Sequence, residues 1–266
     1  RGMSRVIPSG RFATVVDAAA RVFITHGFRR AQVQDVADLL DLSKGSLYGY
    51  AAGKRALFAA ALRYADGMEP LPERDQLPVP APGFGDLAAL VRARLTGELE
   101  TLELTRALAR AGPGPGTSEQ EEFGDVVADL YRRLSKHRTA IKLVDRCAPE
   151  FPELHAAWFD EGRSLQVDGV TAYLRSRAGS GALVVPGRVE LFARTVVEVC
   201  VLWAVHRHWD PAPRPLGLPT AAADFNDAEV SDMLVQLLTR AVRPDAGPAS
   251  DPNGTTRPAQ TVGDLT

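Results

Sequence analysis

The amino-acid sequence predicts an all-α protein built from two helical domains. Apolar residues recur at helical spacing through most of the chain, whereas Gly and Pro gather at 67–85 and 112–116. Only the short run 183–185 resembles a strand. We expect domains over 1–66 and 86–242, a Pro/Gly-rich linker or loop over 67–85, and a disordered tail over 243–266.

The first predicted helix carries a continuous apolar stripe and ends near Gly27, because glycine favours helix C-termini. The stripe consists of Phe12, Val15, Val16, Ala19, Val22, Phe23 and His26. A similar stripe follows Gly53, made of Leu57, Phe58, Ala61, Leu62 and Ala65. These two helices should form a small core around whatever lies between them.

The segment 33–50 reads as two short helices joined by a tight turn. Apolar residues in 33–40 share one helical face, and Asp41 then interrupts the pattern with a residue that tolerates a left-handed backbone. Ser43 is a suitable N-cap for a second helix over 44–50. Leu47 is the only strong aliphatic anchor in that helix, and its glycines remove side-chain bulk. Such a helix suits the major groove of B-DNA better than a protein core.

The charge distribution agrees with a nucleic-acid role for the N-terminal part. The whole chain has 31 Lys and Arg against 33 Asp and Glu, a net charge of −2. Residues 1–65 hold ten basic and four acidic residues, a net of +6, which leaves −8 for the remainder. A basic end on an acidic body is typical of a DNA-binding protein, although surface solvation alone is an alternative explanation.

An ordered set of residues over about 11–65 resembles the DNA-binding domain of TetR-family (tetracycline-repressor-like) transcriptional regulators. The matching positions are Ala18, Ala19, Phe23, Gly27, Phe28, Asp35, Val36, Ala37, the run 43–48, Tyr50 and Lys54. The resemblance implies an N-terminal three-helix helix-turn-helix domain followed by a helical ligand-binding and dimerisation domain. It also implies a homodimeric repressor of a palindromic operator, released by a small-molecule effector.

Several residues depart from the family pattern within the segment that carries the resemblance. Asp41 occupies a turn position where glycine is usual, Ala51 replaces a phenylalanine, and Arg55 replaces an acidic residue. Ala31 and Gln32 stand where Ser or Thr commonly caps the second helix. The residues that we expect to contact DNA are Arg11, Gln32, Ser43, Lys44, Gly45, Ser46, Tyr48, Gly49, Tyr50, Lys54 and Arg55.

Two C-terminal apolar stripes supply a candidate interface. The resemblance implies that the helices over 187–209 and 226–242 pair with their copies in a four-helix dimer contact. The expected interface residues are Phe192, Val196, Val199, Val230, Met233, Leu234, Leu237 and Leu238. Alternatively, a monomer buries both stripes in its own core.

The resemblance also implies an effector site between the middle helices, which we expect over 86–111, 118–147 and 152–177. Aromatic residues are the candidates for its lining, with a histidine as polar contact, although each could equally be a core residue. They are Tyr131, His155, Trp158, Phe159, Tyr173 and Trp203, with Phe151 and His137 as further possibilities.

Composition and the motif search narrow the remaining classes of protein. No apolar run is long enough for a membrane span, and no signal-peptide pattern occurs. Cys147 and Cys200 are far apart in the sequence, which fits a reducing cytoplasm better than a disulfide scaffold. Both fall in predicted helices, where a cysteine is more often a core residue than a redox sensor. No phosphate loop, nucleophile elbow or zinc motif is present, so we expect no enzyme, cofactor or metal. A helical enzyme or interaction module whose helix-turn-helix is structural is the alternative.

Overall fold

The computed structural model describes residues 10–209 and 225–243 and confirms the predicted all-α class. The described residues form helices and connecting loops, with no strand among them. A single bridge pairs Ala51 with Val79 in parallel. The predicted tail lies outside the described residues apart from Arg243.

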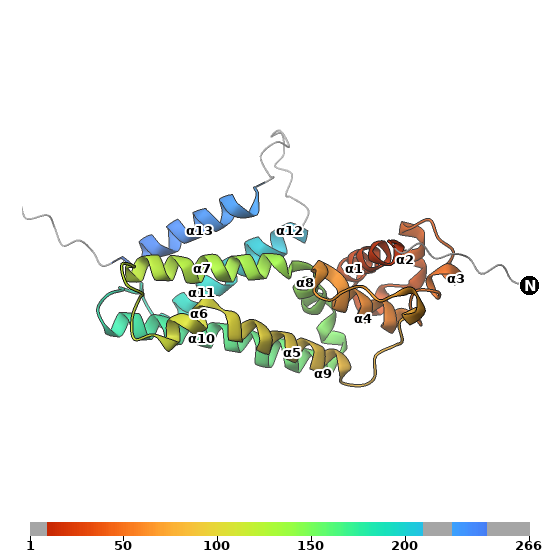
Figure 1. Cartoon of the computed structure of the whole chain (residues 1–266), viewed down its shortest axis with the longest axis horizontal. Coiled ribbons are helices and arrows are strands. Elements are labelled where there is room, and N and C mark those ends of the chain that lie inside the picture. Colours follow the sequence, from red (N-terminus) through yellow and green to blue (C-terminus); the bar gives the residue numbers. More distant parts are fainter. Residues whose placement is uncertain (1–9, 210–224, 244–266) are drawn as a thin grey trace, which may run out of the picture.

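The N-terminal helices gather at one end of the long axis of the molecule (Figure 1). They are α1 (Arg11–Arg30), α2 (Val33–Leu39), α3 (Lys44–Leu47), α4 (Lys54–Tyr64) and the short η1 (Ala65–Gly67). The second helix of the predicted pair is therefore shorter than 44–50. Its start has the predicted cap, since the hydroxyl of Ser43 accepts a hydrogen bond from the backbone N–H of Ser46 at 3.1 Å.

The rest of the chain forms an elongated helical body beside this end (Figure 1). Its α-helices are α5 (Asp86–Thr101), α6 (Glu103–Ala109), α7 (Glu119–Lys136), α8 (Arg138–Cys147), α9 (Pro152–His155), α10 (Arg163–Gly179), α11 (Val189–Val201), α12 (Arg207–Trp209) and α13 (Asp227–Ala241). Two short 3-10 helices are η2 (Arg74–Gln76) and η3 (Ala148–Glu150). Two π-helical segments are η4 (Ala156–Gly162) and η5 (Leu202–His206).

Other predicted elements also differ from the structure. The helix expected over 86–111 breaks at Leu102, because the buried Asp129 of α7 accepts a hydrogen bond from the N–H of Glu103 at 2.9 Å and caps a new helix. The helix expected over 152–177 contains the π-helical η4. The run 183–185 is not a strand; the N–H of Val184 bonds instead to the carbonyl of Val242 at 3.0 Å.

Reciprocal caps define the starts of two long body helices. Ser118 accepts from the N–H of Glu121 at 3.2 Å, and the Glu121 carboxylate accepts from the N–H of Ser118 at 2.7 Å. Asn226 and Glu229 repeat this arrangement at the start of α13, with both distances 3.0 Å. Each pair satisfies N–H groups that a helix end leaves unpaired, so both helices have a defined first residue.

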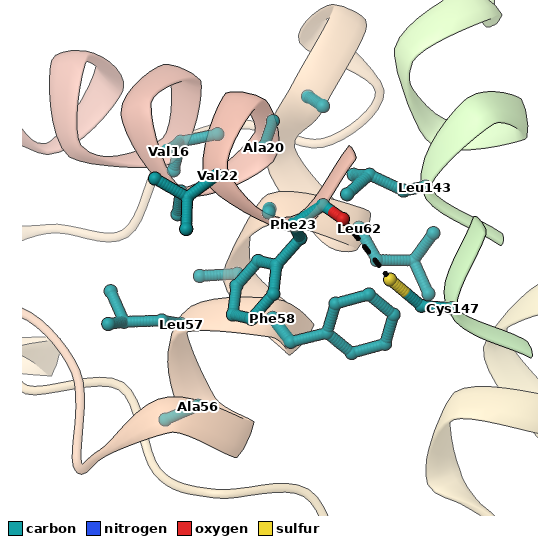
Figure 2. Close-up of a cluster of buried hydrophobic side chains, with 14 of the residues drawn as sticks. Val16, Ala20, Val22, Phe23, Ala56, Leu57, Phe58, Leu62, Leu143 and Cys147 are labelled. Carbon is teal, nitrogen blue, oxygen red and sulfur yellow. Dashed lines mark hydrogen bonds between the residues drawn. The ribbon is translucent and has the colours of Figure 1, made fainter. Parts of the chain in front are cut away.

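One hydrophobic core joins the N-terminal helices to α5, α8 and α9. Figure 2 shows Phe23, Phe58 and Leu62 packed toward Leu143 and Cys147 of α8. The Cys147 thiol donates to the carbonyl of Phe23 at 3.7 Å. This core contains residues from both sides of position 66, where we predicted the first domain to end. The N-terminal helices and the body are therefore packed against each other at this boundary.

A second core lies inside the body, between α7, α10, α11 and α13. At its edge the buried Arg177 donates to the equally buried Glu122 at 2.8 Å and to the carbonyl of Ala107 at 2.7 Å. The Tyr173 hydroxyl donates to the same carboxylate at 3.2 Å. Burial raises the pKa of Tyr173, and the neighbouring Glu122 raises it further. These bonds tie α6, α7 and α10 together.

The Glu122–Arg177 pair gives a test of this core. Arg177→Met should lower the free energy of unfolding by up to about 3–5 kcal/mol, because it leaves the buried Glu122 carboxylate with only the part-exposed Arg110, at 3.3 Å, as its cation. Replacing both partners with Met should recover most of that loss. Arg175→Met is the matched control: its pair with Glu190 is exposed, so its loss should be at most about 1 kcal/mol. Urea unfolding measures all three, and equal losses for Arg177→Met and Arg175→Met would contradict the assignment.

Candidate functional site

The turn between α2 and α3 aims the second helix outward. Asp41 adopts φ 51°, the left-handed conformation that the sequence led us to expect at that position. The N–H of Leu42 then bonds back to the carbonyl of Ala37 at 2.9 Å and closes the turn. Leu47 is fully buried and is the anchor of α3 on the core. One leucine thus fixes the helix and leaves its other sides free.

The exposed side of α3 is polar and small. Lys44, Gly45 and Tyr48 are exposed, with Tyr48 at 46% of its full accessible surface. Ser46 and Gly49 are partly buried, and the Ser46 hydroxyl lies 2.8 Å from that of Ser43. The exposed helix of a helix-turn-helix can therefore approach a surface closely at the two glycines, with an amino group and a phenol beside them.

Tyr50 does not project from α3, so our prediction that it faces DNA from that helix is wrong. It lies beyond the end of α3, is only 4% exposed, and stacks on Phe12 with ring centroids 6.4 Å apart. The predicted linker packs against this region, since the N–H of Val79 donates to the Tyr50 carbonyl at 2.9 Å and the carbonyl of Val79 accepts from Ala52 at 2.9 Å. The small Ala51 allows this approach: it is buried and bridges to Val79.

The remaining predicted DNA contacts divide into two groups. Arg11 and Gln32 are exposed at the starts of α1 and α2. Asp35 accepts from the N–H of Gln32 at 2.7 Å and satisfies the helix start that lacks a Ser or Thr. Lys54, by contrast, donates to the carbonyl of Arg29 at 3.0 Å and lies 4.7 Å from the ring of Phe28.

Arg55 is exposed but turns toward the body. Its guanidinium carbon lies 5.5 Å from the ring of Phe151, which belongs to the core shared with α8 and α9. Lys54 and Arg55 therefore cover the joint between the N-terminal helices and the body. Two cations at a helix start oppose the helix dipole, which is why we predicted that both contact DNA phosphates. The aromatic rings at the joint account for the two cations equally well.

An apolar cavity, partly open to solvent, lies between α5, α7, α8, η4 and α10; the empty space that its lining bounds, open solvent included, is about 830 Å³. Leu62 of α4 and Met68 close its end nearest the N-terminal helices. Of the predicted effector residues Trp158 lines it, and so does His137, the further possibility. The other lining residues are mainly aliphatic: Val91, Leu95, Leu99, Leu102, Leu130, Leu134, Ala140, Ile141, Val144, Gly162 and Leu165.

The polar part of the cavity wall is a chain of paired charges that the sequence analysis missed. Glu98 accepts from Arg133 at 2.6 Å and lies 3.1 Å from Nε2 of His137. Burial opposes ionisation, but these two neighbours outweigh it, so the pKa of Glu98 is lowered. Arg94 donates to Glu69 at 2.8 Å, and burial lowers its pKa. Both Arg94 and Glu98 lie on the apolar face of the predicted helix, at i+3 and i+7 from Val91, which was the available signal.

The other predicted effector residues lie elsewhere. The Tyr131 hydroxyl donates to Asp227 of α13 at 2.9 Å, and Tyr173 belongs to the buried Glu122 cluster. His155 is exposed and lies 4.8 Å from the ring of Phe159, outside the cavity. Trp203 packs against Phe225 at 6.1 Å. Phe151 is in the joint core. These aromatic residues are packing residues, as their helical spacing also allowed.

The predicted dimer stripes are partly used within one chain. Five of the predicted interface residues are already buried in the core of the single chain and offer little surface to a second copy: Phe192, Val196, Val230, Leu234 and Leu238. Val199 is partly buried against the same core. Met233 and Leu237 of α13 are 42% and 57% exposed. Leu191 of α11 and Leu202 of η5, which the prediction omitted, are 66% and 43% exposed.

Both cysteines are core residues. Burial raises the pKa of the Cys147 thiol to about 12, and burial also raises that of Cys200 to about 12. Their reactive thiolate forms are therefore suppressed near neutral pH. In the part of the chain that the structure describes, no cluster of His, Cys, Asp and Glu could hold a metal ion, and no helix is long and apolar enough to cross a membrane.

Comparison with known proteins agrees with this geometry. Residues 15–61 match the family model described as bacterial regulatory proteins, tetR family. Among curated proteins, none matches the sequence significantly. The structure resembles that of the ketosteroid transcriptional regulator KstR2 of Mycobacterium tuberculosis, with 15% identity, a TM-score of 0.51 and coverage of 90% of this chain and 98% of that one.

Two further solved structures share the fold. The probable transcriptional regulatory protein RHA5900 has 16% identity and a TM-score of 0.53, over 88% of this chain and all of that one. SCO3833 from Streptomyces coelicolor A3 has 18% identity and a TM-score of 0.51, over 86% and 91% of the two chains. Residues 15–61 thus match the tetR family model, and the described part of the chain shares the two-part helical fold of these solved regulators.

Proposed function

We propose that this DNA-binding regulator is a homodimeric repressor that binds a palindromic operator and is released by a small-molecule effector. The observation that carries the DNA-binding part is the exposed side of α3. Lys44, Gly45 and Tyr48 face outward there, while a single buried leucine holds the helix. A helix with so little apolar surface to spare is suited to a groove lined with hydrogen-bonding groups.

Exposed aliphatic residues support a dimer. Met233 and Leu237 on α13, with Leu191 and Leu202 on α11 and η5, leave apolar surface on helices whose opposite faces are already buried. Two copies paired through these helices would bury that surface and form a four-helix contact. A two-fold dimer presents two α3 helices to the same side of DNA, and half-sites about 34–36 Å apart make the operator palindromic.

Helix α8 supports coupling between the cavity and the DNA-binding end. Ala140, Ile141 and Val144 line the cavity from α8, while Cys147 at its end bonds to Phe23 of α1. The N–H groups of Thr139 and Ala140 donate to Asp66, just after α4, at 2.8 and 3.0 Å. A ligand that binds better to a shifted position of α8 would therefore lower DNA affinity, and DNA would lower ligand affinity by the same factor.

Lys44→Ala tests the reading helix. It should weaken operator binding by about 1–3 kcal/mol, because the lost ammonium can reach base edges or phosphate, and should leave the unfolding free energy unchanged. Lys136→Ala, at an exposed lysine in the last turn of α7 and outside the helix-turn-helix, is the matched control. The operator comes from sequencing fragments that the protein selects from its own genome, and binding is measured by gel shift. Unchanged affinity of Lys44→Ala would remove α3 from the interface.

Lys54→Ala separates two roles of one cation. Because its amino group caps the Arg29 carbonyl, the substitution should lower the unfolding free energy by about 1 kcal/mol and leave the salt dependence of DNA binding unchanged. Denaturation and gel shifts over a salt series measure both quantities. A fall in the logarithmic salt slope of about 0.9 without loss of stability would instead assign Lys54 to a phosphate.

Leu237→Glu tests the dimer face. A carboxylate on this exposed position should dissociate the dimer and leave each chain folded, since burial of an unpaired charge between two copies is costly. Leu71→Glu, at a leucine that is 40% exposed in the loop before η2, is the control and should stay dimeric. Sedimentation velocity gives the mass of each species. An intact dimer of Leu237→Glu would refute this face.

A further inference from the structure

A second apolar cavity adjoins the first, and the empty space that its lining bounds, open solvent included, is about 490 Å³. The two share Leu99, Leu102, Leu130, Leu165 and Gln166 as lining residues. The second extends along α6 toward Leu104, Leu108 and Val126. Between Val91 and Leu102 alone, the helical rise gives the combined space a length of ~16 Å. A long, narrow apolar space of this kind fits an extended chain better than a compact ring system.

The wall offers no free cation to an acidic ligand. The guanidinium of Arg94 donates to the carbonyls of Leu62 and Arg63 at 2.7 and 2.8 Å and to Glu69. That of Arg133 is shared among Glu98, Asp129 and Thr101. A carboxylate brought into this space would therefore have to break an existing pair or stay unpaired, and either event disfavours binding.

His137 supplies one polar atom that lacks a partner. Its Nε2 lies 3.1 Å from Oε1 of Glu98, and a carboxylate can only accept, so Nε2 carries the proton of that bond. In the tautomer whose single ring proton is on Nε2, Nδ1 is an acceptor. Nδ1 is buried and has no hydrogen-bond partner among residues 10–209 and 225–243. A ligand that donates one hydrogen bond would satisfy it.

We infer that the joined cavities bind an uncharged straight-chain lipophile with one hydroxyl group. The hydroxyl donates to Nδ1 of His137, and the alkyl chain runs past Leu99 and Leu102 into the second cavity. This inference rests on the proposed function for its regulatory meaning, since it names the chemical class of the effector. The binding itself needs no DNA and is measured on the free protein.

Titration with straight-chain primary alcohols tests the shape of the space. Binding to the full chain is followed by tryptophan fluorescence, because Trp158 lines the cavity. From hexanol to decanol the Kd should fall about fourfold per added methylene. Decanoate and the compact decahydronaphthol, which have as many carbons as decanol, should each bind at least tenfold more weakly. Affinity that does not grow with chain length, or decanoate binding as tightly as decanol, would overturn the inference.

A comparison of two ligands, on the unmodified protein and on one variant, tests the hydrogen bond. Decanol should bind about three- to tenfold more tightly than decyl methyl ether, which lacks the donor. In His137→Phe this advantage should disappear, while the dependence on chain length remains. An advantage that survives in a folded His137→Phe protein, checked by circular dichroism, would remove His137 as the partner of the hydroxyl.

Gly169 allows the far end of the space to be filled. It lines the second cavity only, and a Cβ there would meet Leu104 Cδ2 at 3.1 Å. Gly169→Leu should weaken tetradecanol about fifteenfold, the equivalent of two methylenes, and leave hexanol unchanged. Gly97→Leu on α5 is the matched control, because a Cβ there meets no described atom within 4 Å. Leu104→Ala, which enlarges the same end, should strengthen tetradecanol; equal effects on both alcohols would contradict the chain's path.

The ligand class and the release of the protein from DNA are tested separately. If alcohols bind as expected but leave operator affinity unchanged, the ligand class stands and the release mechanism of the proposed function fails. If the protein binds its operator but no alcohol at any length, the ligand class fails and DNA binding is unaffected.

Discussion

The aromatic core between the N-terminal helices and the body fixes the direction in which α3 points. Phe58 of α4 stacks on Phe151 with ring centroids 5.4 Å apart, and Phe28 at the end of α1 meets the same ring at 4.6 Å. Glu150 accepts from the N–H of Arg29 at 2.9 Å beside them. Protein interiors are packed as densely as organic crystals, so α1 and α4 cannot move independently of the segment that carries Phe151.

Helix α8 connects this joint with the cavity. Ala140 and Val144 of α8 belong to the joint core and also line the cavity. Asp145 on α8 accepts from the indole of Trp158 at 2.6 Å and lies 3.6 Å from Nε2 of His206 in η5. A displacement of α8 at the cavity would therefore alter contacts with the N-terminal helices and with η5. The Glu122–Arg177 cluster holds α6, α7 and α10 together on the far side. Helix α8, like α5, has contacts both with the N-terminal helices and with the cavity.

The sequence predicts the local features of this molecule better than the remote ones. Helix positions follow from apolar periodicity, and the Ser43 cap and the left-handed Asp41 follow from side-chain chemistry within a few residues. Tyr50 was misplaced because the helix was extended past its actual end at Leu47, so its burial against Phe12 was not visible. The break at Leu102 depends on Asp129, and the state of the α13 stripe depends on α7; both partners are distant in sequence. A stripe predicts burial and does not identify the partner that buries it.

The cavity itself arises from irregular helices. Regular helices pack with axes 8–10 Å apart and fill the space between them with side chains, so room for a ligand needs a departure from that geometry. Two departures line this cavity: the break at Leu102 and the π-helical η4, which ends at Gly162. A Cβ at Gly162 would meet Leu95 Cδ1 at 2.7 Å, so α5 and η4 approach closely there, and a larger residue would have to displace the Leu95 side chain. Past this contact the chain turns at Leu102 into α6, held by Asp129, and the space between α5, α7 and α10 opens. The Asp129 carboxylate, which caps α6 directly after the end of α5, also accepts from Arg133. Asp129 therefore both shapes the cavity and pairs a cation in its wall.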